Sequence, residues 1–127
     1  MTQFTELEQS IYDRLLELLH AIKQGDADTY TRLSAKDLTA IEPETGGQIV
    51  EGLPFHVFLI ERSTMADYHL EVINPTIKVE GNMAYACYNL VTSQKKDDTF
   101  RFDQVQETRI FQRIDGLWKM IHFHRSA

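Results

Sequence analysis

Glutamate and histidine side chains near the end of the chain could carry out acid–base chemistry if the strands that hold them pair. His122 and His124 are two positions apart in a strand-like run, so their side chains face the same side of a strand. Symmetric pairing about the Asp115–Gly116 turn places Glu107 opposite His124. This pair could transfer protons or, as we favour, only orient its two side chains.

The residue types support a metal site or a reactive thiol less than they support acid–base chemistry. Together with His56, the two C-terminal histidines could supply imidazole ligands, but the sequence offers no obvious carboxylate to orient each ring. Cys87 is the only cysteine, and it has no cationic neighbour in the sequence that would activate its thiol. We therefore expect no metal, no cofactor and an unreactive core thiol.

The Asp115–Gly116 pair predicts a type I′ turn between two strands that carry large apolar groups on both faces. A single helical layer covers only one of these faces. Leaving large apolar side chains in water would forgo roughly 1.5–3 kcal/mol each. We therefore predict that Phe111, Trp118 and Met120, which share one face, form an interface between identical subunits. The alternative is that strand curvature hides both faces within one subunit.

Three helices are predicted before the long strands. Thr5 and Glu8 can form a capping box at the start of the first helix, and Gly25 suits the left-handed residue after its end. Asp26 can cap a short second helix, and Pro54 fits the first turn of a third. The buried stripe of the first helix has apolar residues three or four positions apart: Phe4, Leu7, Ile11, Leu15, Leu18 and Ile22.

Strand-like runs fill most of the remaining chain. We expect a bend at Asn74–Pro75, because proline cannot donate to a sheet ladder. Helices first and a long antiparallel meander last indicate an α+β fold. The predicted strands cover residues 38–42, 48–51, 69–79, 83–94, 99–114 and 117–125.

Length and charge restrict the classes of function. A chain of 127 residues fits one domain, 1–127, with one core. A net charge of -6 argues against nucleic-acid binding, which needs surplus lysine and arginine. We find neither a signal peptide at the N-terminus nor an apolar run of the ~20 residues that would span a membrane. With a lone cysteine, we expect a cytoplasmic protein without membrane contacts.

Six segments, in order along almost the whole chain, resemble the association (hub) domain of calcium/calmodulin-dependent protein kinase II. They are Leu38-Thr-Ala-Ile-Glu-Pro-Glu44, Val50-Glu-Gly-Leu-Pro-Phe-His56, Ile73-Asn-Pro75, Glu107-Thr-Arg109, Asp115-Gly-Leu-Trp118 and His122-Phe-His-Arg-Ser126. The resemblance implies a nuclear transport factor 2-like cone, a curved sheet wrapped around the first helix with a pocket inside. It also implies homodimers packed through their sheets, which in the kinase hub stack into rings.

The chain has no glycine-rich loop, catalytic-loop motif or Asp-Phe-Gly motif of a kinase. We therefore expect a free-standing hub relative without kinase activity of its own.

The resemblance also implies a binding site for a small carboxylate. Arginines line the cone in the hub family, and two of them correspond to Arg109 and Arg125, whose planar guanidinium groups match a carboxylate with paired hydrogen bonds. His56 matches a histidine near the same pocket, and Glu107 and Tyr88 complete the predicted site. The catalytic residues, if there are any, are not identified.

Regular pairing of the last hairpin would put Arg109 and Arg125 on opposite faces of the sheet. If both serve one pocket, a β-bulge must reverse the alternation of one strand. We predict this bulge between Thr108 and Phe111 or between Met120 and His124. The alternative is that each arginine simply pairs with a glutamate, either Glu107 or a residue of the first helix.

A second hypothesis is that the chain is a small enzyme whose active site lies in the same cone. Ketosteroid isomerase, scytalone dehydratase and limonene epoxide hydrolase belong to this superfamily and use Asp, His or Tyr for acid–base work. A lyase, isomerase or hydrolase is therefore the alternative function. The groups available here are Tyr12, Tyr88, His56, His122, His124, Glu107 and Asp103.

Overall fold

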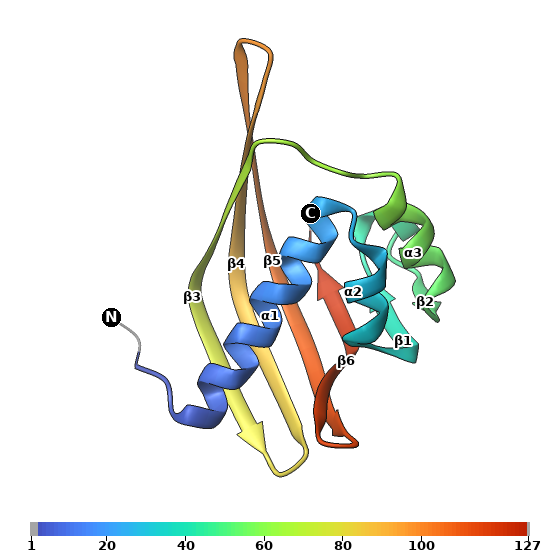
Figure 1. Cartoon of the computed structure of the whole chain (residues 1–127), viewed down its shortest axis with the longest axis vertical. Helices are drawn as coiled ribbons and strands as arrows, with labels where there is room; N and C mark the ends of the chain where they lie inside the picture. The colour runs from blue at the N-terminus through green and yellow to red at the C-terminus, as the bar shows by residue number, and fades with distance from the viewer. Residues whose placement is uncertain (1–2, 127) are drawn as a thin grey trace.

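The computed structural model describes residues 3–126 and has the predicted α+β architecture (Figure 1). Three α-helices precede or interrupt the strands of one six-stranded sheet. No helix in this part of the chain is both long and apolar enough to cross a bilayer. The elements are α1 (Glu6–Gln24), α2 (Ala27–Arg32), β1 (Ser34–Ile41), η1 (Pro43–Thr45), β2 (Ile49–Glu51), α3 (Pro54–Glu61), β3 (Tyr68–Glu80), β4 (Met83–Lys96), β5 (Thr99–Ile114) and β6 (Leu117–Arg125).

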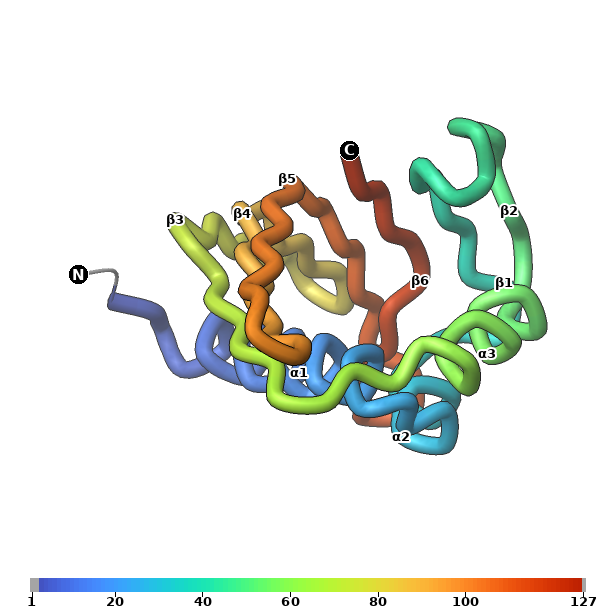
Figure 2. Tube along the Cα trace, turned by 90° about the horizontal axis from the view of Figure 1, so that it is seen from above, coloured from blue at the N-terminus to red at the C-terminus, as the bar shows by residue number. Residues whose placement is uncertain are grey.

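Helix α1 has the predicted boundaries because both of its ends are capped by local sequence. The side chain of Thr5 accepts from the backbone N–H of Glu8, and the carboxylate of Glu8 accepts from the N–H of Thr5. Gly25 ends the helix at φ 72°, in the left-handed region that glycine adopts without strain. The helix lies across the sheet, and Figure 2 shows the sheet curving around the helical side of the molecule.

The sheet order is β2-β1-β6-β5-β4-β3, antiparallel except where β1 runs parallel to β6. The start predicted for the first strand, residue 38, is wrong, because β1 begins at Ser34. Ser34 pairs with Met120, and the N–H of Met120 donates to the carbonyl of Leu33 at 2.9 Å. This backbone pairing with a distant strand leaves no alternating side-chain pattern for sequence reasoning to detect.

The meander that follows α3 agrees closely with the prediction. Strands β5 and β6 have the predicted bounds, and the predicted bend at Asn74–Pro75 is confirmed. The register of β3 against β4 shifts between Ile73 and Thr76, and Asn74 takes a positive φ of 53°. The bend helps the sheet to curve over α1.

The concave face of the sheet forms the core with α1, and this overturns the predicted interface. Phe111, Trp118 and Met120 are only 0%, 6% and 0% exposed within the single chain, in one apolar cluster with Leu15 and Leu18 of α1. The interface predicted on these three residues is therefore wrong. Sheet curvature hides this one face within the subunit, whereas the alternative supposed that both faces are hidden.

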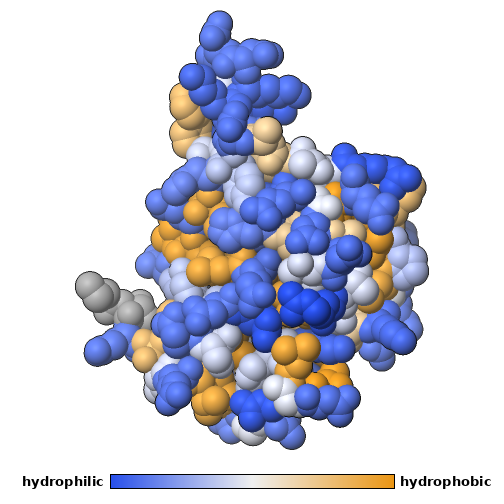
Figure 3. Space-filling model, in the orientation of Figure 1, coloured by the Kyte–Doolittle hydropathy of each residue, from blue (hydrophilic) through white to orange (hydrophobic). Residues whose placement is uncertain are grey.

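Strands β4 and β5 extend beyond the body of the molecule as a two-stranded arm (Figure 1). The arm is mainly hydrophilic where Figure 3 shows it. Phe100 and Phe102 on this arm are the exception, with 65% and 75% of their surface exposed and their rings stacked 6.3 Å apart. They lie at alternate positions of β5, and so on the same face of that strand.

Candidate functional site

A β-bulge in the last hairpin brings the two predicted arginines to one face, which confirms the bulge prediction. Phe111 pairs with Met120 and Ile110 with His122, so Ile121 is an extra residue in β6. Beyond the bulge the pairing has shifted by one residue.

This shift decides which residues share a face around the site. Glu107 lies opposite Arg125, and Arg109 lies opposite Phe123. The predicted Glu107–His124 pair is therefore wrong, because His124 pairs with Thr108 on the opposite face of the sheet.

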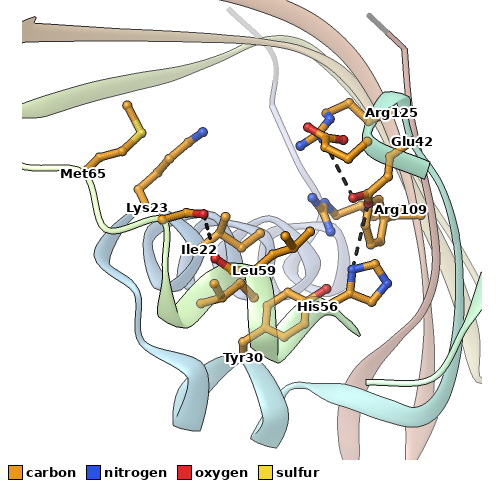
Figure 4. A pocket seen from close by; sticks show the side chains of 13 residues that line it. Ile22, Lys23, Tyr30, Glu42, His56, Leu59, Met65, Arg109 and Arg125 are labelled. Atoms are coloured by element: carbon orange, nitrogen blue, oxygen red, sulfur yellow. Dashed lines mark hydrogen bonds and ion pairs between the residues drawn. The ribbon is translucent and has the colours of Figure 1, made fainter. Parts of the chain in front are cut away.

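The inner end of this hairpin borders a cavity of about 230 Å³ (Figure 4). Arg109, Arg125 and His56 line it, as predicted. Glu107 and Tyr88 lie behind Arg109 and contact its guanidinium group. The lining residues are Ile22, Lys23, Tyr30, Glu42, Glu44, His56, Leu59, Ile60, Ser63, Met65, Arg109, Phe123 and Arg125.

Arg109 is fully enclosed and held by its neighbours. Its Nε donates to the hydroxyl of Tyr88 at 3.0 Å and to Oε1 of Glu107 at 3.3 Å, and its Nη2 reaches the same oxygen at 3.3 Å. The Tyr88 hydroxyl donates to Glu107 at 2.5 Å, and the guanidinium stacks 4.4 Å from the centre of the Phe123 ring. Of the two alternatives for Arg109, pairing with Glu107 is therefore present.

The charges in this network are set by burial and by pairing. Burial raises the pKa of Tyr88, so its phenol stays neutral. Burial alone would lower the pKa of Arg109, but the carboxylate of Glu107 and the hydroxyl groups of Tyr88 and Tyr30 together outweigh it, and the pKa is raised. The result is one buried ion pair with a neutral donor beside it.

Arg125 is held more loosely at the open side of the cavity. Its Nη2 forms an ion pair with Glu44 and lies 4.0 Å from the carboxylate of Glu42. Glu44 belongs to the short helix η1 and is half exposed, whereas Glu42 is buried. Burial raises the pKa of the Glu42 carboxyl, against the opposing charge of Arg125. Glu44 is thus the one partner of Arg125 that can turn into solvent.

His56 lies beside the arginines as a neutral imidazole. Its Nδ1 is 4.0 Å from Oε2 of Glu42, and its buried Nε2 has no hydrogen-bond partner among residues 3–126. Burial, with Arg109 and Arg125 nearby, lowers the pKa of His56 to about 4. The residue lines the cavity, but Nε2 itself is shielded from it.

The lowered pKa of His56 predicts a loss of stability in mild acid. The imidazole of His56 takes up a proton near pH 6.5 in the unfolded chain but only near pH 4 in the folded chain. Its contribution to the free energy of unfolding is therefore fully present above pH 6.5. The free energy of unfolding should fall by about 3 kcal/mol as the pH drops from 6.5 to about 4. Urea unfolding at several pH values should show this slope reduced in His56→Gln. His69→Gln, which changes an exposed histidine, should keep the wild-type slope, and equal slopes in all three proteins would contradict the assignment.

The other candidate residues do not join the site. Nδ1 of His122 lies 2.7 Å from the hydroxyl of Thr39, on the convex side of the sheet. His122 and His124 are therefore separated from His56, and the three do not converge. The thiol of Cys87 lies 3.3 Å from the hydroxyl of Thr108.

Three charged residues of the site were missed by the sequence reasoning. Glu42 and Glu44 stand inside one of the segments that carried the resemblance, which was a usable signal. Lys23 had none, because a lysine in the last turn of a helix is ordinary.

These features define a class of protein: a nuclear transport factor 2-like cone, as expected. A solved NTF2-like protein from Cytophaga hutchinsonii superposes with a TM-score of 0.80 over 98% of this chain and 99% of its own. The two chains are 19% identical, so this likeness shows the fold alone.

Within that class, the chain belongs to the calcium/calmodulin-dependent protein kinase II association domain family, whose model matches residues 7–127. The association domain of the Caenorhabditis elegans kinase superposes with a TM-score of 0.90 at 32% identity and covers 95% of each chain. The rabbit (Oryctolagus cuniculus) kinase type II subunit delta is 35% identical over 125 residues, which is 94% of this chain. The match spans only 24% of that kinase.

Proposed function

We propose that this chain is a self-associating domain, forming a homodimer or a larger ring, whose cone pocket binds a small acidic ligand. The observation that carries the assembly is the convex face of the sheet. Tyr85, Val91, Ile110 and Ile121 are only half buried there. Within residues 3–126, all three α-helices lie on the other side of the sheet (Figure 2).

A second subunit of the same kind would cover this face. Large apolar side chains that share a face and lack a covering layer are typical of interfaces. The same side of the sheet continues onto the arm, where Phe100 and Phe102 are exposed. We therefore propose that the interface lies on the face opposite to Phe111, Trp118 and Met120. The two subunits would still pack sheet against sheet.

Light scattering coupled to size-exclusion chromatography tests this proposal on the purified chain. We expect a mass that is a multiple of 14.8 kDa and that stays constant over a range of micromolar concentrations. A mass of 14.8 kDa across that range would contradict the self-association.

Partners of other classes are not proposed, because the net charge of -6 disfavours nucleic acid and anionic membrane surfaces. We propose a cytoplasmic location on the basis of the free thiol of Cys87.

The acidic ligand is proposed because the cavity offers positive charge that can be exposed without breaking the core. Arg109 is committed to Glu107, but Arg125 needs only to exchange Glu44 for a ligand carboxylate. The imidazole of His56 beside it is neutral and adds no negative charge. The kinase activity of the longer relatives is not proposed, since this chain corresponds to a quarter of their length and contains none of the kinase motifs.

Opposite changes around Arg125 should shift carboxylate affinity in opposite directions. Glu44→Gln removes the competing anion and should strengthen binding of a small carboxylate by roughly threefold to tenfold, the value of a partly exposed ion pair. Arg125→Met should weaken it by about tenfold or more. Calorimetric titration with pentanoate measures both changes, and Glu51→Gln, outside the cavity, serves as the control. Equal affinities in all four proteins would remove Arg125 from the proposed site.

The second candidate function, a small lyase, isomerase or hydrolase, is favoured by one observation. His56 is neutral at pH 7, lines the cavity and lies near the carboxylate of Glu42, an arrangement that can move a proton. Its low pKa makes it a weak base, so binding remains the leading function. Exchange of solvent deuterium into a bound carboxylic acid, lost in His56→Gln, would favour catalysis.

A further inference from the structure

The cavity has a cation on the wall opposite the arginines. Lys23 stands in the last turn of α1, and Figure 4 shows its ammonium group entering the cavity from the side across from Arg109 and Arg125. The backbone N–H of Met65 donates to the carbonyl of Lys23 at 2.7 Å, which fixes this turn of the helix against the loop after α3. The position of Lys23 on the cavity wall is therefore set by the backbone.

The ion pairs of the three cations differ. Arg109 pairs with Glu107, and Arg125 pairs with Glu44. Lys23, by contrast, has no carboxylate within 4.0 Å among residues 3–126. A half-buried ammonium without an anion is a ready partner for a ligand carboxylate.

The surroundings of Lys23 agree with this role. Burial lowers the pKa of its ammonium, and Arg125 and Arg109 add to this effect, while Glu107 and Asp103 oppose it. A bound anion would relieve both the burial cost and the repulsion from the arginines. Among the cations of the described cavity, the one without an ion pair is therefore Lys23, on the α1 wall and away from Arg125.

We propose that the pocket selects a short dicarboxylate over a monocarboxylate, with one carboxylate on Lys23 and the other on Arg125. This inference rests on the proposed function, in which the Glu44 side chain moves into solvent and leaves Arg125 to the ligand. A monocarboxylate can satisfy only one wall, whereas a dicarboxylate satisfies both. Glu42, whose pKa is raised by burial, can take up a proton and so remove its repulsion from the second carboxylate. The volume of about 230 Å³ is below the range of drug-sized sites and suits a small metabolite.

Calorimetric titration of the assembled protein with glutarate and with pentanoate, acids of equal chain length, tests the inference. We expect the wild-type protein to bind glutarate about tenfold more tightly than pentanoate at constant ionic strength. Lys23→Met keeps the length of the side chain without its charge and should reduce this preference to about twofold or less. Lys95→Met, which removes a charge from the exposed arm, should keep the full preference. A series from malonate to adipate then gives the span between the two carboxylate positions.

The outcomes separate this inference from the proposed function. Equal binding of glutarate and pentanoate by the wild-type protein, or an unchanged preference in Lys23→Met, would overturn the dicarboxylate and leave the acid-binding pocket standing. Binding of neither acid would contradict the pocket proposal itself. If Lys23→Met proves unstable, Lys23→Gln provides the same comparison, since it also removes the charge at a position that is only half buried.

Discussion

Replacing Glu107 by glutamine is expected to lower the free energy of unfolding by about 3–5 kcal/mol, although the side chain keeps its size. The reason is that Arg109 would remain charged in the core without its anion. Both residues are almost fully buried, 4% and 2% exposed, and Glu107 is the carboxylate paired with Arg109. Chemical denaturation followed by circular dichroism measures the loss.

A double-mutant cycle distinguishes this ion pair from ordinary packing. Arg109→Met alone should also destabilise the protein, because it leaves the carboxylate of Glu107 buried and unpaired. The double variant with Glu107→Gln and Arg109→Met should lose much less than the sum of the two single losses. Glu44→Gln makes the same chemical change at a half-exposed position and should stay within about 1 kcal/mol of wild type. A loss below about 1 kcal/mol for Glu107→Gln would contradict a charged Arg109.

The buried pair has a consequence for the site. Because Arg109 is held by Glu107 and Tyr88 and stacks on Phe123, it acts as a fixed wall and a fixed positive field. Arg125 and Lys23, which lie nearer to solvent, are the groups that can reach a ligand. Recognition is thus expected to depend on the movable cations, and stability on the buried one.

Replacing Ile110 by lysine is expected to convert the assembly into monomers of 14.8 kDa. Ile110 lies on the convex face between Tyr85 of β4 and His122 of β6, and each subunit would bring its own lysine into a desolvated interface. Burying a charge without a partner there should weaken association at least about a hundredfold. Light scattering at several concentrations measures the change, and Asn82→Lys in the turn between β3 and β4 is the matched control.

Met120 provides the comparison for the other face of the same hairpin. Met120→Ala should lower the free energy of unfolding by about 2–5 kcal/mol through loss of buried contacts. It should not change the mass of the assembly, because its side chain is buried in the core of its own subunit. Dissociation of Met120→Ala with an intact assembly in Ile110→Lys would place the interface on the concave face and contradict the proposal.

Much of the fold could be predicted because its signals are local. The capping box of Thr5 and Glu8, the left-handed Gly25 and the Asp115–Gly116 turn each act within a few residues. The bulge near Ile121 was predicted for a different reason: regular pairing would have separated two arginines that the family resemblance places in one pocket. Because side chains of a strand alternate between two faces, one extra residue is enough to bring both arginines to the same face.

The wrong and missing parts of the prediction depend on contacts between distant segments. Side-chain alternation is identical for a face covered by its own helix and a face covered by a partner, so Phe111 and Met120 were assigned to the interface. The parallel pairing of Ser34 with Met120 involves backbone groups that carry no side-chain signature. The ion pair between Glu44 and Arg125, which are far apart in sequence, exists only once β1 lies beside β6.

Sequence patterns were enough to predict most of the helix and strand boundaries, the α+β fold and the family that the chain resembles. Caps, turns and periodicity are properties of a few consecutive residues, and they survive any change in global packing. The choice of the core face of the sheet, and the position of Lys23 across a cavity from Arg125, could be seen only in the folded molecule. Such placements arise from sheet curvature and from the packing of α1 over it, to which every element contributes.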